Sequence, residues 1–211
     1  MTSLTHGVKN VKYRRVDGMK INSIVSDGSE FFELPALPRS KEWSQFPYKN
    51  KVGAYCASIE NLLNFIDTIM DGNSYLEIGT FDGLSLSVLA EKYPEKEFNA
   101  IDLFTEGKDT AGGCLKYFIE NNKHLDNVNL FKGTSTEALP LIKDRKFDFV
   151  FIDGDHSYEW VKTDIENIYP LVSDGGIISF HDWGFPEVQK AILEYFKCKP
   201  THFGDIVYYG K

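Results

Sequence analysis

The sequence has few cysteines and no long apolar segment. Its three cysteines, Cys56, Cys114 and Cys198, are far apart, so they match neither a disulfide framework nor the closely paired cysteines of a zinc site. No stretch approaches about 18 consecutive apolar residues, and the first residues lack the apolar region of a signal peptide. These absences argue against export and membrane insertion, and they predict a cytoplasmic protein with free thiols.

Positive charge is also scarce. The chain carries 23 lysines and arginines against 31 aspartates and glutamates, which gives a formal net charge of -8 at pH 7. Nucleic-acid binding draws much of its affinity from lysine and arginine, so we expect no nucleic-acid partner. A chain of 211 residues is about the size of one large domain. We expect one domain over residues 51–211, preceded by an N-terminal extension over residues 1–50.

The extension is rich in residues that interrupt regular structure. Gly18, Gly28, Pro35, Pro38 and Pro47 break helices and strands alike, so we expect an irregular segment. Its aromatic side chains could pack on the core, cover a substrate pocket as a lid, or form the contact of a homo-oligomer. The sequence leaves these three alternatives open.

From residue 57 onward, helical patterns alternate with short apolar runs. The expected helices are 57–70, 84–93, 110–123, 135–143, 157–170 and 186–197. The expected strands are 74–78, 97–103, 128–132, 147–152 and 176–181, with one or two more within 201–209. This alternation predicts an α/β fold: a doubly wound, mostly parallel, seven-stranded sheet with helices on both faces and an antiparallel C-terminal strand.

The first expected strand ends in a glycine turn, EIGTFDG, which runs from Glu77 to Gly83. Ligands of open parallel sheets bind beyond the carboxyl ends of the strands, and Gly79 and Gly83 let the backbone turn tightly and approach a ligand. The third glycine of the dinucleotide motif is missing, and the carboxylates of Glu77 and Asp82 would repel a pyrophosphate. The turn therefore predicts a ligand that lacks a pyrophosphate and carries an ammonium group.

Two further strand ends suggest that this ligand contains adenosine. Asp102 ends the second strand, 25 residues after Glu77, close to the spacing at which an acid in such folds binds ribose hydroxyls. After the third strand, Thr134 and Ser135 offer small hydroxyl groups that could bind the edge of an adenine.

Acids and histidines cluster after the fourth and fifth expected strands. Asp153 and His156 follow the fourth strand, and His181 and Asp182 end the fifth. Carboxylate oxygens are the ligands that magnesium prefers, whereas an imidazole ligand at His181 would favour manganese, iron or zinc. The alternative is structural: the acids could cap helices, and His181 could satisfy a buried polar neighbour.

These motifs resemble those of the class I S-adenosylmethionine-dependent methyltransferases over residues 51–209. The resemblance implies that the glycine turn, including Phe81, lies against the methionine part of S-adenosyl-L-methionine and that Asp102 holds the ribose. It also implies a cofactor contact at Val52, because the segment before the first helix is similar to one in catechol-type enzymes. Asp153 would contact both the cofactor and a metal ion.

The second cluster resembles that of the metal-dependent O-methyltransferases, which include the catechol, caffeoyl-coenzyme A and macrocin-type sugar enzymes. Asp153, His156 and Tyr158 match the motif D-x-x-H-x-Y, and His181-Asp182 matches the pair after the fifth strand. The resemblance implies a magnesium or manganese ion on Asp153, His181 and Asp182, and a small-molecule hydroxyl, such as that of a sugar, as substrate. Catechol-type enzymes have a lysine base where this chain has His156, so either the histidine takes the proton or the metal alone lowers the pKa of the hydroxyl.

Three other functions remain compatible with the sequence: a metal-independent methyltransferase, an α/β enzyme that binds NAD or a nucleotide sugar, and a non-catalytic binding module. The polar, glycine-rich residues 105–113 could form a flap over the substrate or an ordinary surface loop.

Overall fold

A computed structural model describes residues 11–16, 19–24, 59–69, 71–104, 113 and 115–211. Along the chain the elements are β1 (Val11–Val16), β2 (Met19–Ile24), α1 (Ile59–Ile69), β3 (Ser74–Ile78), α2 (Leu84–Lys92), β4 (Glu97–Asp102), α3 (Leu115–Asn122), β5 (Val128–Lys132), α4 (Ser135–Ile142), β6 (Phe147–Ile152), α5 (Tyr158–Ile168), the 3₁₀ helix η1 (Tyr169–Leu171), β7 (Val172–Phe180), α6 (Pro186–Phe196), β8 (Thr201–Phe203) and β9 (Ile206–Gly210). None of the helices described is long and apolar enough to cross a membrane.

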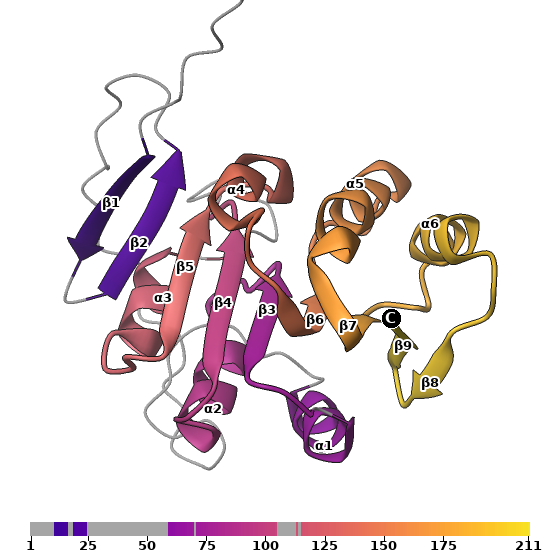
Figure 1. Ribbon diagram of the computed structural model, residues 1–211, viewed down its shortest axis with the longest axis horizontal. Coiled ribbons are helices and arrows are strands. Elements are labelled where there is room, and N and C mark those ends of the chain that lie inside the picture. Colours follow the sequence, from indigo (N-terminus) through magenta and orange to yellow (C-terminus); the bar gives the residue numbers. More distant parts are fainter. Residues whose placement is uncertain (1–10, 17–18, 25–58, 70, 105–112, 114) are drawn as a thin grey trace, which may run out of the picture.

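The strands form one sheet in the order β1-β2-β5-β4-β3-β6-β7-β9-β8 (Figure 1). The strands from β2 across to β7 pair in parallel, whereas β1, β8 and β9 pair with their neighbours in an antiparallel manner. The seven strands from β3 to β9 confirm the predicted doubly wound sheet and its antiparallel C-terminal end. Strand order reverses between β3 and β6, which is where such folds bind their ligands.

The N-terminal segment departs from the prediction of an irregular extension. Residues 11–24 contain the strands β1 and β2, which pair from Val11 with Ile24 to Val16 with Met19, and β2 adds to β5 at the edge of the sheet. The sequence offers a local signal for such a hairpin, because Asp17-Gly18 is a dipeptide typical of two-residue hairpin turns. The rest of residues 1–50 lies outside the described part of the chain, so a lid or a subunit contact there stays a prediction.

Helices cover both faces of the sheet because successive side chains of a strand point to opposite faces. Tyr75 of β3 points into a core shared with α1, α2 and α3, whereas its neighbour Leu76 points into a second core with α4, α5 and α6. Figure 1 shows these two sets of helices on opposite sides of the sheet. Both faces are therefore buried, which explains why β6 is an almost continuous apolar run.

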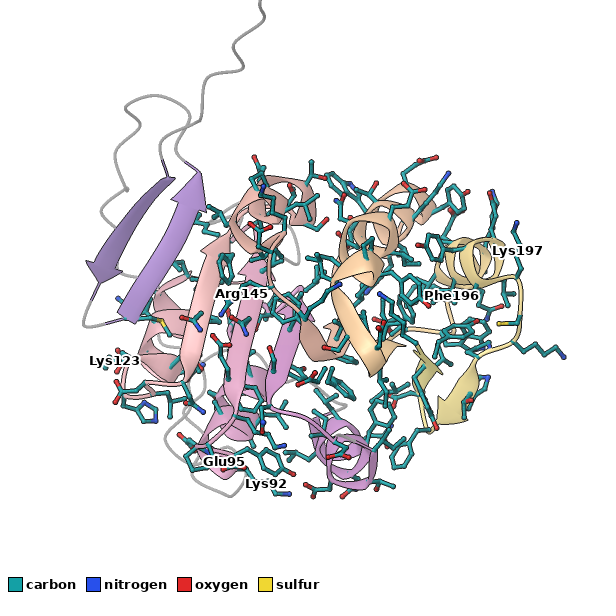
Figure 2. All side chains as sticks on the ribbon, in the orientation of Figure 1. Lys92, Glu95, Lys123, Arg145, Phe196 and Lys197 are labelled. Atoms are coloured by element: carbon teal, nitrogen blue, oxygen red, sulfur yellow. The ribbon has the colours of Figure 1, made fainter. Side chains whose placement is uncertain are left out.

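Aromatic side chains fill much of these cores. The rings of Tyr75 and Phe149 stack with centroids 5.6 Å apart on one side of the sheet. On the other, Phe196 at the end of α6, labelled in Figure 2, has its ring centroid 4.0 Å from that of Tyr209 of β9, on which it stacks. Such pairs contribute about 0.5–1.5 kcal/mol each beyond their buried area. The first pair packs β3 against β6, and the second packs α6 against β9.

Candidate active site

A cavity of about 720 Å³ opens at the carboxyl ends of the parallel strands. Its walls come from residues 77–82, 101–103, 133–135 and 153–156, together with side chains of α5 and the two residues after β7. This volume lies within the range of small-molecule sites. The cavity brings together every predicted site residue except Val52, which lies outside the described residues, and Gly83, which precedes α2 just behind the cavity wall.

Backbone pairing continues past the strand ends and sets the spacing of the site. The amide of Gly79 donates to the carbonyl of Ile101, and the amide of Asp153 donates to the carbonyl of Ile78, both at 2.9 Å. The amide of His181 in turn donates to the carbonyl of Ile152 at 3.1 Å. The residues that follow β3, β6 and β7 therefore lie side by side, about 5 Å apart across the sheet.

The glycine turn requires glycine at its first position. Gly79 has a φ of 81°, and a Cβ there would lie 2.2 Å from the carbonyl oxygen of Asp153. Gly83 has a φ of 67°, and a Cβ there would lie 2.4 Å from Cδ2 of the Phe118 ring. Phe81 also has a positive φ, 55°, which is strained for a bulky residue. Its amide donates a 2.8 Å hydrogen bond to Oδ2 of Asp102, and this bond holds the turn against the end of β4.

Glu77 is a buried carboxylate that faces the cavity. Its Oε2 accepts a hydrogen bond from the Tyr75 hydroxyl and its Oε1 accepts one from the Ser85 hydroxyl, both at 2.8 Å. Burial raises the pKa of Glu77 to about 7 although these hydrogen bonds act in the opposite direction. The carboxyl group is therefore close to its titration midpoint at neutral pH, and a cation placed beside it would favour the ionised form.

Asp102 orients its carboxylate by accepting two backbone hydrogen bonds. Phe81 donates to Oδ2 at 2.8 Å and Phe104 donates to Oδ1 at 2.7 Å. Burial raises the pKa of Asp102 despite these bonds. Each carboxylate oxygen has two lone pairs, so the group can accept further hydrogen bonds from ligand hydroxyls. This geometry suits the predicted contact with a ribose.

Thr134 and Ser135 have different roles at the start of α4. Thr134 is the N-cap: its hydroxyl accepts from the Glu137 amide at 3.1 Å, and the Glu137 carboxylate accepts from the Thr134 amide at 2.9 Å. This capping box engages the threonine hydroxyl with the helix. The Ser135 hydroxyl instead accepts from Asn167 of α5 at 3.0 Å and contacts Asp164. Contacts of either residue with an adenine stay a prediction.

Asp153, His181 and Asp182 meet at the ends of β6 and β7. His181 Nδ1 lies 2.9 Å from Asp182 Oδ2 and 3.3 Å from Asp153 Oδ1, and the three potential ligand atoms all lie within 4.8 Å of one another. Burial alone would lower the pKa of His181, but hydrogen bonds and charges from both aspartates outweigh it and raise the pKa to about 10. The two carboxylates thus create a negative potential that favours a positive charge here.

His156 lies next to this cluster. Its Nε2 is 2.8 Å from Asp182 Oδ2, and its ring stacks on the exposed Phe185 with centroids 4.9 Å apart. The His156 side chain is 42% exposed and lines the cavity. The cluster therefore pairs a possible cation site with an accessible proton acceptor.

Three residues that line or support the site were missed from the sequence. Asp164 and Trp160 of α5 line the cavity, and Asp205 in the β8–β9 turn lies 3.1 Å from His181 Nε2 through its Oδ2. Asn61 of α1 donates to the other oxygen of Asp205. Asp164 could have been found, because it is an acid on the apolar stripe of a helix. Asp205 could not, since only the tertiary structure brings its turn to β7.

The fold and the cavity together define a class I methyltransferase: a doubly wound sheet, an acidic glycine turn after the first strand of its parallel core, and an acid after the next. Residues 76–183 match the model of a family described as methyltransferase domain, which covers just over half of the chain. The chain belongs to this family. The predicted class, an S-adenosylmethionine-dependent methyltransferase, is thereby confirmed.

Individual proteins are similar to this chain over about seven tenths of its length. The uncharacterized protein R132 of Acanthamoeba polyphaga mimivirus is 33% identical over 174 residues, which cover 71% of this chain and 77% of that protein. The O-methyltransferase NovP has a TM-score of 0.55 at 19% identity, over 72% of this chain and 76% of its own. CalS11, a TDP-rhamnose 3'-O-methyltransferase of calicheamicin biosynthesis, has a TM-score of 0.57 at 17% identity, over 72% and 78%. At such identities the two structures support the fold alone.

Proposed function

We propose that the protein is an O-methyltransferase that binds S-adenosylmethionine in the described cavity, works with a divalent metal ion and methylates a hydroxyl group of a small molecule. The grouping of Asp153, His181 and Asp182 beside His156 carries this proposal. An octahedral ion with bonds of about 2.0–2.1 Å needs neighbouring donor atoms about 3 Å apart. The distances of 2.9 and 3.3 Å from His181 Nδ1 to the two carboxylates match this spacing.

The cofactor would lie across the carboxyl ends of β3, β4 and β5. In this arrangement Glu77 faces the ammonium group, Gly79 allows the methionine part to approach the backbone, and Asp102 binds the ribose hydroxyls. The sulfonium methyl group then points toward the cluster after β6 and β7. Magnesium is the expected ion for two carboxylates, and the imidazole of His181 makes manganese a second candidate.

Methyl transfer needs the acceptor oxygen in line with the methyl group, so positioning is the main task of the protein. A divalent ion on this cluster would act as a Lewis acid that lowers the pKa of the acceptor hydroxyl. His156 takes the proton on Nδ1, because its Nε2 faces the Asp182 carboxylate at 2.8 Å, as the new C–O bond forms and the C–S bond breaks, which leaves S-adenosylhomocysteine. The stacked Phe185 offers an apolar surface beside the base, which suits a sugar ring with both C–H faces and hydroxyls.

A titration of S-adenosylhomocysteine and then Mn²⁺, followed by calorimetry and by the loss of the free-ion electron paramagnetic resonance signal, tests both ligands. We expect saturable binding of each, and we expect Asp182→Asn to abolish Mn²⁺ binding only. Asp174→Asn, an exposed aspartate near the opposite end of β7, is the matched control. Absence of S-adenosylhomocysteine binding to the wild type would refute the cofactor assignment.

A metal-independent methyltransferase is the second candidate, because the 2.8 Å contact between His156 and Asp182 is itself a histidine–carboxylate pair that could accept a proton. Transfer of a labelled methyl group to a panel of sugar and phenol acceptors, with and without excess chelator, separates the two. Full turnover in chelator would favour this candidate. Loss of turnover that returns with Mg²⁺ or Mn²⁺ would support the metal-assisted enzyme.

A further inference from the structure

The turn between β8 and β9 lies outside the parallel core and contacts the cluster of Asp153, His181 and Asp182. Asp205 in this turn places its Oδ2 3.1 Å from Nε2 of His181. The other ring nitrogen, Nδ1, faces the two carboxylates of the cluster. An imidazole that donates its Nε2 proton to Asp205 directs Nδ1 toward the cluster. The Asp205 carboxylate therefore orients the nitrogen that His181 offers as a ligand.

Asp205 needs a second anchor because it lies on an exposed turn. Its side chain is 48% exposed, and an exposed side chain moves among several rotamers unless its neighbours hold it. Asn61 of α1 provides this anchor. Its side-chain amide donates to Asp205 Oδ1 and, at 3.4 Å, to the carbonyl oxygen of Phe203. One oxygen of the Asp205 carboxylate is thus held by α1, and the other contacts His181.

The hairpin of β8 and β9 leaves room for this amide. Gly204 has a φ of 61°, and a Cβ there would lie 2.4 Å from Nδ2 of Asn61, so any side chain at this position would displace the amide. One helical turn further along α1, the ring of Phe65 packs on the rings of Phe203 and Tyr208, with centroids 5.2 and 5.1 Å apart. This apolar contact fixes α1 against the hairpin and so places Asn61 beside the turn.

We propose that Asn61 is a positioning residue that acts through Asp205 on His181 and thereby strengthens the binding of a divalent cation at the cluster. The inference rests on the proposed function, because it requires a metal ion on these ligands. Neither Asn61 nor Asp205 is among the described residues that line the cavity. The hydrogen bond to Asp205 is therefore the route by which Asn61 affects the cation.

The expected effect is moderate and concerns the cation alone. Removal of a group that orients a metal-binding histidine weakens metal binding by about 10- to 100-fold. Asn61 is one hydrogen bond further away, and a single hydrogen bond changes an equilibrium by about 2- to 10-fold. We therefore expect Asn61→Ala to weaken Mn²⁺ binding by about 3- to 10-fold. The affinity for S-adenosylhomocysteine should stay within about twofold of the wild type, because the residues around that ligand are unchanged.

Titrations of Mn²⁺ followed by electron paramagnetic resonance, with the affinity for S-adenosylhomocysteine measured by calorimetry on the same proteins, test the proposal. The wild type, Asn61→Ala, Asp205→Ala and the double variant form a double-mutant cycle. Loss of Asn61 should weaken Mn²⁺ binding in the wild type but not in Asp205→Ala, where the link to His181 is already absent. Asn64→Ala, at an exposed asparagine on the next turn of α1, is the matched control and should bind Mn²⁺ as the wild type does.

A second variant reaches the same contact from the hairpin. In Gly204→Ala the new Cβ displaces the Asn61 amide, so this protein should lose Mn²⁺ affinity to the same extent as Asn61→Ala. The melting temperature of each variant shows whether it is folded.

The outcomes separate this inference from the proposed function. If folded Asn61→Ala or Gly204→Ala binds Mn²⁺ as tightly as the wild type, the role of Asn61 is overturned and the proposed function stands. The same holds if Asn61→Ala weakens Mn²⁺ binding equally in the Asp205→Ala background, or if it weakens S-adenosylhomocysteine binding as much as Mn²⁺ binding. No binding of Mn²⁺ to the wild type overturns both the inference and the metal-assisted function.

Discussion

Ligand binding should release a proton from Glu77. The side chain is buried, and its pKa is raised to about 7, so in the free protein at about pH 6.5 roughly three quarters of the molecules carry a protonated Glu77. The ammonium group of S-adenosylhomocysteine, placed beside this carboxyl, stabilises its ionised form. An opposite charge at such a distance lowers a pKa by about 1–3 units.

The size of the effect follows from these values. If binding lowers the pKa of Glu77 by about 2 units, each ligand releases about 0.7 protons at pH 6.5. Calorimetry in two buffers of different ionisation enthalpy, such as PIPES and Bis-Tris, measures this number from the change in apparent binding enthalpy. Glu77→Gln should release almost no proton, whereas Glu95→Gln, at an exposed site labelled in Figure 2, should behave as the wild type.

Stability provides an independent measure of the same group. The native pKa is about 7 and the unfolded one is near 4.5, so the native state binds more protons between these values and stability falls as pH rises through this window. The decline amounts to about 3 kcal/mol and levels off above pH 7. Urea unfolding should show this decline in the wild type and a weaker pH dependence in Glu77→Gln. In the calorimetric experiment, equal proton release on ligand binding by the wild type and by Glu77→Gln would refute the assignment of this proton to Glu77.

Three further variants probe other parts of the site. Asp205→Asn should weaken Mn²⁺ binding about tenfold in calorimetry while S-adenosylhomocysteine affinity stays unchanged, because the Asp205 carboxylate orients His181; equal Mn²⁺ affinity would contradict this role. Gly79→Ala should lower the free energy of unfolding by more than about 2 kcal/mol, because φ is positive there and the new Cβ would clash with the backbone of Asp153. Gly210→Ala, where a Cβ meets open space, should not have this effect. Equal urea midpoints for the two variants would argue against the clash. Thr134→Ala should lose about 1 kcal/mol of unfolding free energy with its cap, and Thr134→Ser should regain most of it; an unchanged midpoint for the alanine variant would show that the cap contributes little.

The local pattern of the sequence was enough to predict the parallel core. Alternating apolar runs and helical stripes gave strand bounds that the structure reproduces at β3, β5 and β6, because each strand is buried on both faces and flanked by turn residues. The alternation of strands and helices also predicts that the carboxyl ends of the parallel strands lie at one edge of the sheet. The sequence therefore predicts that Glu77, Asp102 and Asp153 lie at one edge of the sheet.

Other features depend on contacts between residues far apart in the chain. The pairing of β2 with β5 extends the sheet through residues that read locally as an irregular segment. The raised pKa of Glu77 needs the helices that bury it, and the link from Asp205 to His181 needs a hairpin that folds back beside β7. Periodicity within one element carries no information on such distances or on desolvation.

The glycine turn separates most clearly what the sequence determines from what only the tertiary structure decides. The sequence alone determined that the turn from Glu77 to Gly83 ends a strand and carries acids, since residue type and spacing decide these properties, and it predicted a ligand without a pyrophosphate. Only the tertiary structure decided that Gly79 touches the backbone of Asp153 and that Asp164 faces the same cavity from α5. Packing between separate elements produces those contacts, and no local pattern encodes which elements will meet.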